Sequence, residues 1–463
     1  MVERLRGLDT AFLYLETPTN HLHVAWATVL DTRRAPDAAS ARCLSEMIRD
    51  RLHLVPALRK RLADPRLGYT QPDWIDVDVD PADHCTVHRS ADLEAVAAEV
   101  LSRPLDRTRP LWEVHIVEGL GKGRTGMIMK LHHALLDGPS GAELMVRLLD
   151  FEREGSPIPA APSSLTVDTP PTRAQLDRVA WRRANRAAPR AAAEMRNATD
   201  VLMATQRWDH EHPEVAVPGA LGAPRTSLNQ PITARRAVRF TAVELDVLDK
   251  VRRNTGSTVN DVVLAITGGA LRRYLQRRGS LPTSPLLAMV PVSARDRQST
   301  AGNQLSALIT TLATNIADPI ERLAEVTRVT NTVKLRHEQS GIATLVGVLD
   351  VVPPRVGQQL ARLAEGVALA KWSPLSFNVV VSNVPGPDVP LYFNGAEVES
   401  AYPIGPITDW SAINVTVVSY RRRLAFGLVA CPDVVPDIDE LCNDIDAEID
   451  ALRLTDASAQ TPR

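Results

Sequence analysis

The chain of 463 residues is too long for one ordinary hydrophobic core and long enough for two domains of roughly 200 residues each. Its 44% hydrophobic and 23% charged residues are typical of a globular protein, and the formal net charge of -2 gives no sign of a nucleic-acid-binding protein. No stretch approaches the roughly 18 apolar residues that span a bilayer, and no apolar signal core is present. We therefore expect any contact with a membrane to be peripheral.

The first predicted unit covers residues 1–150. Residues 111–118 and 125–131 have the pattern of strands, and the Gly-rich sequence GLGKGR between them predicts a turn. Three of the nearby glycines, Gly121, Gly123 and Gly126, match GxGxxG. Because this run joins two strands and opens no helix, we do not expect a dinucleotide site.

Metal and redox chemistry have little support in the sequence. The four cysteines form no CxxC pair and no zinc spacing, which favours free thiols in a reducing cytoplasm. His84, Cys85 and His88 come nearest to a ligand cluster, but they lie in a polar segment without partners. We therefore expect no metal site.

The sharpest chemical signal is LHHALLDGPSG at residues 131–141, which contains the pattern HHxxxDG. An apolar strand leads into it and a helix opened by Pro139 follows, so rigid elements would hold a histidine that projects from the loop. Imidazole titrates near neutral pH, and neutral His133 can therefore take a proton from an alcohol. We expect the adjacent His132 to be structural, packing or bonding to backbone.

The two remaining residues of the pattern, Asp137 and Gly138, are expected to have structural roles. Asp137 either complements the dipole of the following helix or orients the motif through an arginine, and we favour the second interpretation. Gly138 is expected to serve backbone shape. The chain contains no GxSxG, so a serine-hydrolase elbow is not expected.

Residues 151–224 read as a linker rich in Pro, Ala and Arg, in which Pro189 interrupts a helical stretch. Residues 172–207 contain eight arginines against three acidic residues, a local charge of +5. We predict that this basic segment helps the protein to sit on anionic lipid surfaces.

The second predicted unit covers residues 225–455, and residues 456–463 are predicted to be a disordered tail. Thr241 and Glu244 have the spacing of a capping box for a helix that ends near Gly256, and another helix opens at Thr258. Residues 376–387 and 412–430 are rich in strand formers, and residues 437–452 have the period of a helix. Because strands and helices alternate in both halves, the predicted class is α/β or α+β.

The ordered set of motifs resembles the bacterial wax ester synthase/diacylglycerol acyltransferase family. This family belongs to the CoA-dependent acyltransferase superfamily, which also includes chloramphenicol acetyltransferase and condensation domains. The motifs that carry the resemblance are LDTAFLYLETPTNHLHV, PLWEVHIVEGL, HHALLDG, APRTSLNQPIT, TVNDVVLAITGGALRRYL, PVSARD, GNQLS and SNVPGP. HHxxxDG alone marks only the superfamily, whereas the whole set is specific and covers nearly the whole chain.

The resemblance implies two chloramphenicol-acetyltransferase-like subdomains with the active site between them. It implies that acyl-CoA and diacylglycerol or a fatty alcohol give triacylglycerol or a wax ester, with His133 deprotonating the acceptor hydroxyl. No metal or bound cofactor is required, because acyl-CoA is a co-substrate. The expected location is the cytoplasm, on the inner face of the membrane or on lipid droplets, and the sequence gives no oligomeric state.

The resemblance also suggests roles for residues outside HHxxxDG. By analogy with the superfamily, Arg295 is the expected partner of Asp137. The apolar stretch 343–372 is a core helix, the cover of an acyl tunnel or a membrane contact. The candidates for substrate binding are Pro110, Leu111, Trp112, Asn260, Asp261, Asn303 and Asn383.

Several of these residues have a structural alternative. Pro110, Leu111 and Trp112 either line the acyl path or belong to the core, and Asp261 sits where a helix cap is expected. Two other functions stay open at this point: acylation of a specialised alcohol, such as a polyketide-derived or glycolipid one, and a lipid-surface binding protein with a degenerate site. The intact HHALLDG argues against the last of these.

Overall fold

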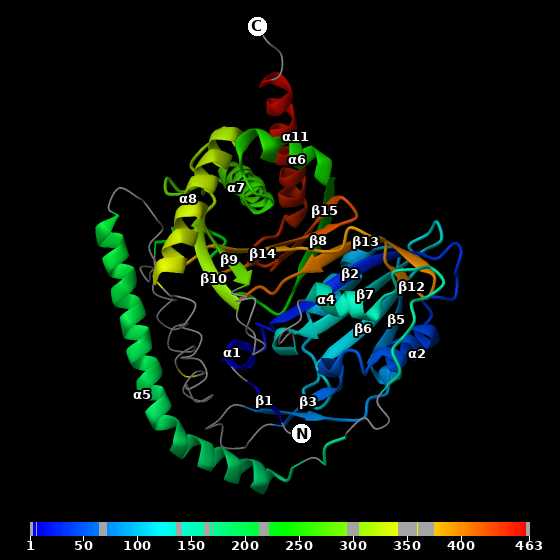
Figure 1. Cartoon of the computed structure of the whole chain (residues 1–463). Coiled ribbons are helices and arrows are strands. Elements are labelled where there is room, and N and C mark those ends of the chain that lie inside the picture. Colours follow the sequence, from blue (N-terminus) through cyan, green and yellow to red (C-terminus); the bar gives the residue numbers. More distant parts are fainter. Residues whose placement is uncertain are drawn as a thin grey trace.

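The computed structural model describes residues 3–5, 7–63, 72–135, 141–161, 167–169, 171–212, 222–293, 305–340, 359 and 375–459. In these residues, helices pack on two six-stranded sheets, and a three-stranded sheet lies near the amino terminus (Figure 1). The small sheet contains β1 (Glu3–Arg4), β4 (Asp73–Asp76) and β3 (Lys60–Ala63). The predicted mixed class with two subdomains is confirmed.

The first large sheet carries the HHxxxDG strand near its centre. Its strands, in spatial order, are β12 (Tyr392–Phe393), β13 (Ala396–Ile404), β2 (His23–Asp31), β7 (Arg124–His132), β6 (Trp112–Glu118) and β5 (Cys85–Arg89). β7 is antiparallel to both of its neighbours, and β5 pairs parallel with β6. The helices of this half are α1 (Gly7–Leu15), α2 (Ala41–Arg51), α3 (Leu93–Leu101) and α4 (Gly141–Leu148).

β7 is apolar along most of its length because both faces of the sheet are covered. Ile128 lies in the hydrophobic core shared with α3, while Met129 and Leu131 lie in the core on the opposite face. The Gly-rich turn that precedes β7 requires the left-handed backbone, with φ of +74° at Gly121 and +67° at Gly123. The predicted strand, turn and strand are therefore confirmed.

The second large sheet belongs to the carboxyl-terminal half. Its strands, in spatial order, are β10 (Leu305–Thr311), β9 (Leu287–Ser293), β11 (Val379–Val384), β14 (Ile413–Tyr420), β15 (Arg423–Ala430) and β8 (Ala237–Glu244). The helices of this half are α6 (Leu245–Thr255), α7 (Val259–Arg277), α8 (Pro319–Ser340) and α11 (Ile438–Ala459). α7 packs against both α8 and α11.

Two strands of the carboxyl-terminal half lie in the first sheet. β13 pairs antiparallel with β2 from Ile404 opposite Ala25 to Glu397 opposite Asp31, with an irregularity between Val398 and Ser400. The sequence did not predict that these strands would join the first sheet, because the pattern of a strand does not reveal which sheet it joins.

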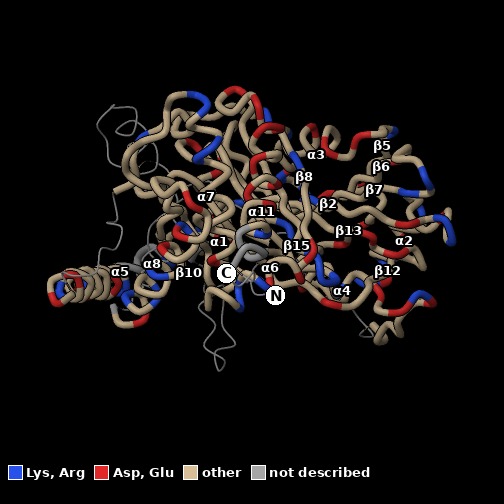
Figure 2. The backbone as a smooth tube through the Cα atoms, turned by 90° about the horizontal axis from the view of Figure 1, so that it is seen from above, with Lys and Arg blue, Asp and Glu red and all other residues tan. Residues whose placement is uncertain are grey.

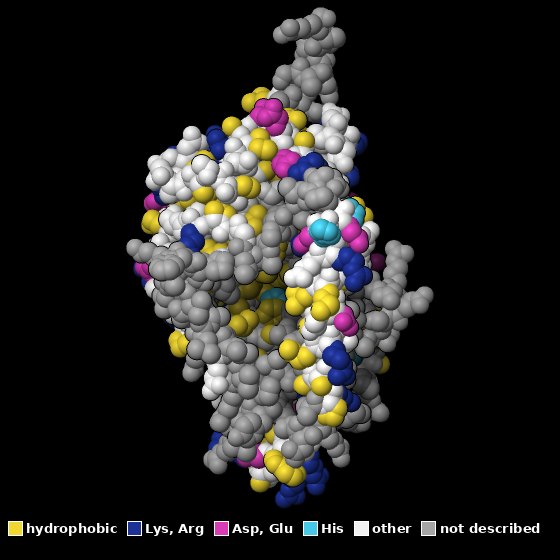
Figure 3. All heavy atoms as spheres, turned by 90° about the vertical axis from the view of Figure 1, so that its left-hand side faces the viewer, with side chains coloured by type: hydrophobic (Ala, Val, Ile, Leu, Met, Phe, Trp, Pro, Cys, Tyr) yellow, Lys and Arg dark blue, Asp and Glu magenta, His cyan; other side chains and the backbone are white. Residues whose placement is uncertain are grey.

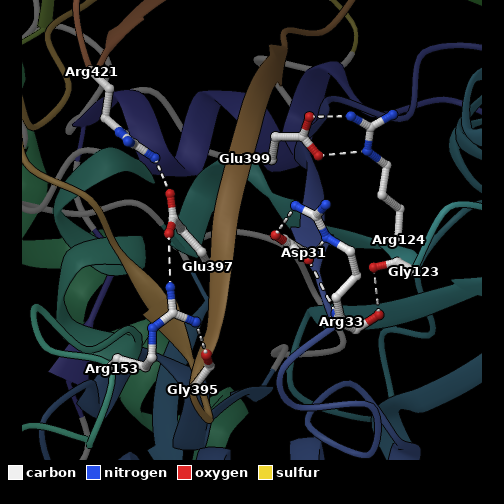
Figure 4. A network of polar contacts seen from close by, with 10 residues as sticks. Asp31, Arg33, Gly123, Arg124, Arg153, Gly395, Glu397, Glu399 and Arg421 are labelled. Carbon is white, nitrogen blue, oxygen red and sulfur yellow. Dashed lines mark hydrogen bonds and ion pairs between the residues drawn. The ribbon is translucent and has the colours of Figure 1, made fainter.

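Ion pairs of β13 lie on the exposed side of the first sheet (Figure 4). Arg124 donates to Glu399 across 2.6 Å, Arg153 donates to Glu397 across 3.0 Å, and Arg421 also pairs with Glu397. Exposed pairs contribute little free energy, so backbone pairing and apolar burial must hold the exchanged strand.

The two halves pack closely where β13 crosses β15. A Cβ atom on Gly427 would lie 1.7 Å from the carbonyl oxygen of Pro403, so only glycine allows the two backbones to approach. Acidic and basic residues are intermixed along the described backbone (Figure 2).

Three details of the sequence prediction are wrong. Thr241 and Glu244 do not form a capping box: β8 continues through Glu244, the Thr241 hydroxyl bonds Asp446, and Glu244 precedes α6 without a side-chain capping bond. Pro189 does not interrupt its helix: α5 (Arg173–Glu211) runs through it. The loss of one backbone donor there is tolerated in a helix of 39 residues that opens with a capping box at Thr172. The predicted tail is helical as far as Ala459, because α11 continues to that residue.

Other helix predictions are confirmed. Gly256 ends α6 with a φ of +65°. α7 opens with a capping box in which Thr258 and Asp261 bond reciprocally. Of the apolar stretch 343–372, the structure describes only Gln359.

Candidate active site

His133 stands at the end of β7, where the chain leaves the sheet. It begins a 3-10 turn, His133–Leu135, directly after the strand. Its backbone N–H donates to the carbonyl of Leu22 across 3.1 Å, and the N–H of His132 donates to the carbonyl of Leu111 across 3.0 Å. The backbone of the histidine pair is thus held by the chain on both sides of β7.

The imidazole of His133 is partly buried and stacks on the ring of Phe12, with ring centroids 3.8 Å apart. Burial, with a smaller contribution from His132, lowers the pKa of His133 to about 4, although the backbone of His133 itself opposes the shift. Among the described residues, no group bonds its buried Nδ1 atom. At neutral pH the ring is therefore uncharged and able to accept a proton.

His132 is buried, with 1% of its surface exposed. Its Nδ1 atom accepts the N–H of Ala134 across 3.1 Å, so the proton of the neutral ring belongs on Nε2. That Nε2 atom lies 3.6 Å from a carboxylate oxygen of Glu16, and Arg107 lies 3.2 Å from the same oxygen. These contacts favour the predicted structural role of His132.

Two more histidines lie beside the motif. His23 is opposite His132 in the β2–β7 ladder, with ring centroids 6.0 Å apart, and burial holds its pKa well below the ordinary value. His21 and His23 also line a small hollow with Arg236, Pro406 and Val429. This end of the first sheet therefore faces the carboxyl-terminal half.

A second, small hollow has an almost entirely apolar lining. Trp26 of β2 and Val398 of β13 contribute to its wall, together with Met145 and Val146 of α4, the helix that follows HHxxxDG. Val418 completes the wall from the second sheet. The hollow thus presents an apolar surface between the two halves. Part of its wall comes from α4, which follows HHxxxDG in the sequence.

The PLW residues belong to the core. Leu111 and Trp112 are fully buried, and the indole N–H of Trp112 donates to the carbonyl of Leu58 across 2.9 Å. His84 stacks on the Trp112 ring at 4.1 Å. Of the two predicted alternatives, core packing accounts for these contacts, and the Leu111 carbonyl additionally anchors His132.

The other predicted substrate-binding residues are only partly accounted for. Asp261 is the helix cap that was the alternative interpretation, since its carboxylate accepts the N–H of Thr258 across 2.9 Å. Asn260 and Asn383 are half-buried, and no described contact links either of them to His133. The remaining predicted residues, Asp137, Gly138, Arg295 and Asn303, lie outside the described residues.

No cluster of three metal-ligating side chains occurs in the part of the chain that the structure describes. His84 and His88 have separate partners, since His84 bonds the carbonyl of Trp112 and His88 meets His115 across 3.0 Å. Cys85 lies near Ser45, and burial raises the pKa of its thiol.

Sequence reasoning assigned no role to Phe12 or Glu16, although both lie in the motif LDTAFLYLET. Their spacing of four residues, which places side chains on one side of a helix, was the available signal. His21 and His23, two residues apart in a strand pattern, gave a similar signal.

Comparison with known proteins gives a consistent result. Residues 5–263 match the model of the wax ester synthase/diacylglycerol acyltransferase catalytic domain, and residues 301–453 match the WS/DGAT C-terminal domain. A Mycobacterium tuberculosis protein named as a candidate diacylglycerol O-acyltransferase is 32% identical, covering 94% of this chain and 87% of the relative. A Mycobacterium bovis protein with the same kind of name is 33% identical over 97% of this chain and 90% of the relative.

Solved structures agree with these relatives. The wax ester synthase/diacylglycerol acyltransferase from Marinobacter aquaeolei is 27% identical, with a TM-score of 0.69 and coverage of 98% of this chain and 100% of that one. The starter condensation domain of rhizomide synthetase, solved with C8-CoA, shares the fold at 16% identity, with a TM-score of 0.53 and coverage of 100% and 96%.

Proposed function

The chain belongs to the wax ester synthase/diacylglycerol acyltransferase family and is an acyltransferase, and we propose that His133 is the base of its reaction. In this proposal a long-chain acyl group passes from acyl-CoA to diacylglycerol or a fatty alcohol, giving triacylglycerol or a wax ester. The observation that carries it is the uncharged, desolvated imidazole at the end of β7, with its pKa lowered to about 4.

The reaction follows from that imidazole. Neutral His133 takes the proton of the acceptor hydroxyl while the oxygen attacks the thioester carbonyl. The tetrahedral intermediate collapses, the carbon–sulfur bond breaks, and the proton passes from His133 to the departing thiolate, giving CoA as its free thiol. The scheme needs no metal and no bound cofactor, but both substrates must occupy the site together.

The apolar hollow supports a hydrocarbon substrate. Its walls come from β2, α4, β13 and the second sheet, so it lies between the halves and presents apolar side chains to a hydrocarbon chain that enters there. Burial of hydrocarbon contributes about 0.8 kcal/mol for each CH₂ group, which makes such a surface selective for long chains.

We further propose that α5 places the enzyme on anionic lipid surfaces. In the part of the chain that the structure describes, no helix is long and apolar enough to cross a bilayer. α5 nevertheless exposes large apolar side chains, with Trp181 63% exposed and Met195, Leu202 and Met203 similarly so. At about 100° per residue, these four side chains fall within a sector of roughly 100°.

A row of arginines borders this stripe. Arg178, Arg182, Arg196 and Arg207 are exposed and lie within about 40° of one another on one side of it. Figure 3 shows the resulting mixture of hydrophobic and basic side chains along α5. The opposite side faces the protein, where Trp208 donates to Gln339 of α8 across 2.8 Å. An apolar stripe flanked by arginines is the pattern of a helix that lies in a lipid interface.

Vesicle sedimentation tests this surface. Wild-type protein should bind anionic vesicles more tightly than neutral ones, and binding should weaken as salt screens the arginines. Replacing Trp181, Met195 and Leu202 by serine should reduce binding, whereas Val389→Ser, at another exposed apolar site, should not. Equal binding to neutral and anionic vesicles would refute the electrostatic part.

The acceptor is identified by a panel assay. The enzyme is supplied with palmitoyl-CoA and, in separate reactions, with diacylglycerol, a long-chain alcohol, a glycolipid alcohol and a polyketide-derived alcohol, while free thiol is followed. The proposal expects acceptor-dependent thiol release with diacylglycerol or the long-chain alcohol and recovery of the corresponding ester. Ester formed only from the glycolipid or polyketide-derived alcohol would refute the proposed acceptor.

A further inference from the structure

The amino-terminal helix lies directly against the histidine pair. Phe12 belongs to α1, and Glu16 follows its last residue. The spacing of four residues brings both side chains to the same side of the helix, where Phe12 meets His133 and Glu16 faces His132. One short segment thus contacts both rings of the motif.

The contact with His133 is a stack. The ring planes of Phe12 and His133 are inclined by 29°, with centroids 3.8 Å apart. A stacked ring covers one face of the imidazole and restricts its rotation, so that face is closed to a substrate. The same cover contributes to the burial of the ring, and burial is the main cause of the lowered pKa of His133.

The contact with His132 acts on the turn that presents His133. The Nδ1 atom of His132 can accept the N–H of Ala134 only while the ring carries its proton on Nε2. The Glu16 oxygen opposite Nε2 favours that tautomer, and Arg107 holds the same oxygen. Burial alone would raise the pKa of Glu16, but contacts with His132 and Arg107 hold it below its ordinary value, so Glu16 stays an acceptor.

The distance of 3.6 Å between His132 and Glu16 is longer than a hydrogen bond. Among the described residues, no group forms a hydrogen bond with the Nε2 atom of His132 or with the Glu16 oxygen that faces it. A shift of roughly 0.6 Å would therefore satisfy both buried atoms at once. Contacts of this kind commonly tighten when substrate binds.

The segment after α1 is fixed from the carboxyl-terminal half. The side-chain amide of Asn20 donates to the carboxylate of Asp409 across 2.8 Å, and the backbone N–H of Asp409 returns a bond of 3.0 Å. The other oxygen of Asp409 accepts the N–H of Ile232 across 2.7 Å. The position of α1 over the motif therefore depends on both halves of the molecule.

We propose that Phe12 and Glu16 are positioning residues of the acyltransferase site. Phe12 orients the His133 ring by stacking, and Glu16 fixes the tautomer of His132 that holds the 3-10 turn. The inference rests on the proposed role of His133 as the base. Neither residue touches the reacting atoms, and each acts through a histidine of the motif.

Substitutions at Glu16 show whether this residue acts as a hydrogen-bond acceptor for His132 or only through its negative charge. Glu16→Ala leaves the Nε2 proton of His132 without an acceptor and should lower kcat about tenfold to a hundredfold, with KM for palmitoyl-CoA nearly unchanged. Glu16→Gln keeps an oxygen at the same place and should restore most of the lost kcat. A Gln variant as slow as the Ala variant would contradict the tautomer argument, because the charge would then be the essential property.

Substitution at Phe12 tests the stack. Phe12→Leu should lower kcat about tenfold and move the acid limb of the pH profile upward, because water gains access to the His133 ring. Leu15→Ala is the matched control on the same helix, since Leu15 lies next to Glu16 and is 45% exposed. An unchanged kcat and pH profile in folded Phe12→Leu protein would overturn the role of Phe12.

Ring ¹⁵N spectra of histidine-labelled protein make the test independent of turnover. His132→Asn supplies the assignment, and wild-type His132 should show only the Nε2-protonated tautomer. Glu16→Ala should populate the Nδ1-protonated form, and Leu15→Ala should not. An unchanged His132 tautomer in Glu16→Ala would refute the inference whatever the activity. Full activity in His133→Ala would instead refute the proposed function.

Discussion

The desolvated state of His133 predicts an unusual pH dependence. A histidine of ordinary pKa, near 6.5, would be only about 3% uncharged at pH 5, whereas a pKa of about 4 leaves about nine-tenths of the molecules uncharged. Because the proposed base works only in its uncharged form, the lowered pKa should retain activity as the pH falls. We therefore expect kcat/KM to stay nearly constant from pH 7 to pH 5 and to decline as the pH approaches 4.

The assay is the initial rate of ester formation at subsaturating palmitoyl-CoA, measured every half unit of pH from 4 to 8. Enzyme held at each pH and returned to pH 7 supplies the control for acid inactivation. An acid limb near 6.5 in protein that recovers fully would refute the argument, because it would mean that water reaches the His133 ring freely. An acid limb near pH 4 that moves upward in Phe12→Leu would support both the burial of the His133 ring and the part that Phe12 has in it.

Three further predictions concern the substrates and the motif. Val146→Trp, which fills part of the apolar hollow, should lower kcat/KM for palmitoyl-CoA about tenfold and spare butyryl-CoA; equal losses with both would exclude the hollow as a chain site. If Asp137 and Arg295 form a buried pair, each single alanine variant should destabilise the fold by roughly 3–5 kcal/mol and the double variant by less than their sum, and additive values in denaturant unfolding would reject the pairing. Transfer without an acyl-enzyme predicts intersecting steady-state lines and no covalent adduct after incubation with acyl-CoA alone; a stoichiometric adduct that alcohol discharges, seen by intact-protein mass spectrometry, would point to a Ser or Cys nucleophile.

Local features were predictable where one short segment determines them. The strands around the Gly-rich turn follow from apolar runs and from glycines that must adopt positive φ, and the helix after Thr258 follows from its capping box. His133 could be selected because the motif, its leading strand and imidazole chemistry coincide. The same local rules failed at Thr241, where pairing of β8 with β15 outweighed a capping pattern.

Features that depend on distant segments were not predictable from one sequence. The pattern of β13 indicates a strand but does not say that it joins the first sheet beside β2. The position of α1 over the histidine pair depends on Asn20 and Asp409, which are 389 residues apart in the chain. The core position of Trp112 depends on the carbonyl of Leu58, which no local pattern reveals.

The central claim, that His133 is the base of an acyl transfer to an alcohol, is tested most directly by the rate of ester formation in His133→Ala. The measurement uses palmitoyl-CoA and the best acceptor of the panel, with circular dichroism and thermal unfolding to establish that the variant is folded. The account predicts a fall in kcat of about 10²–10⁴ without loss of the fold. A folded His133→Ala protein that makes ester at the wild-type rate would contradict it.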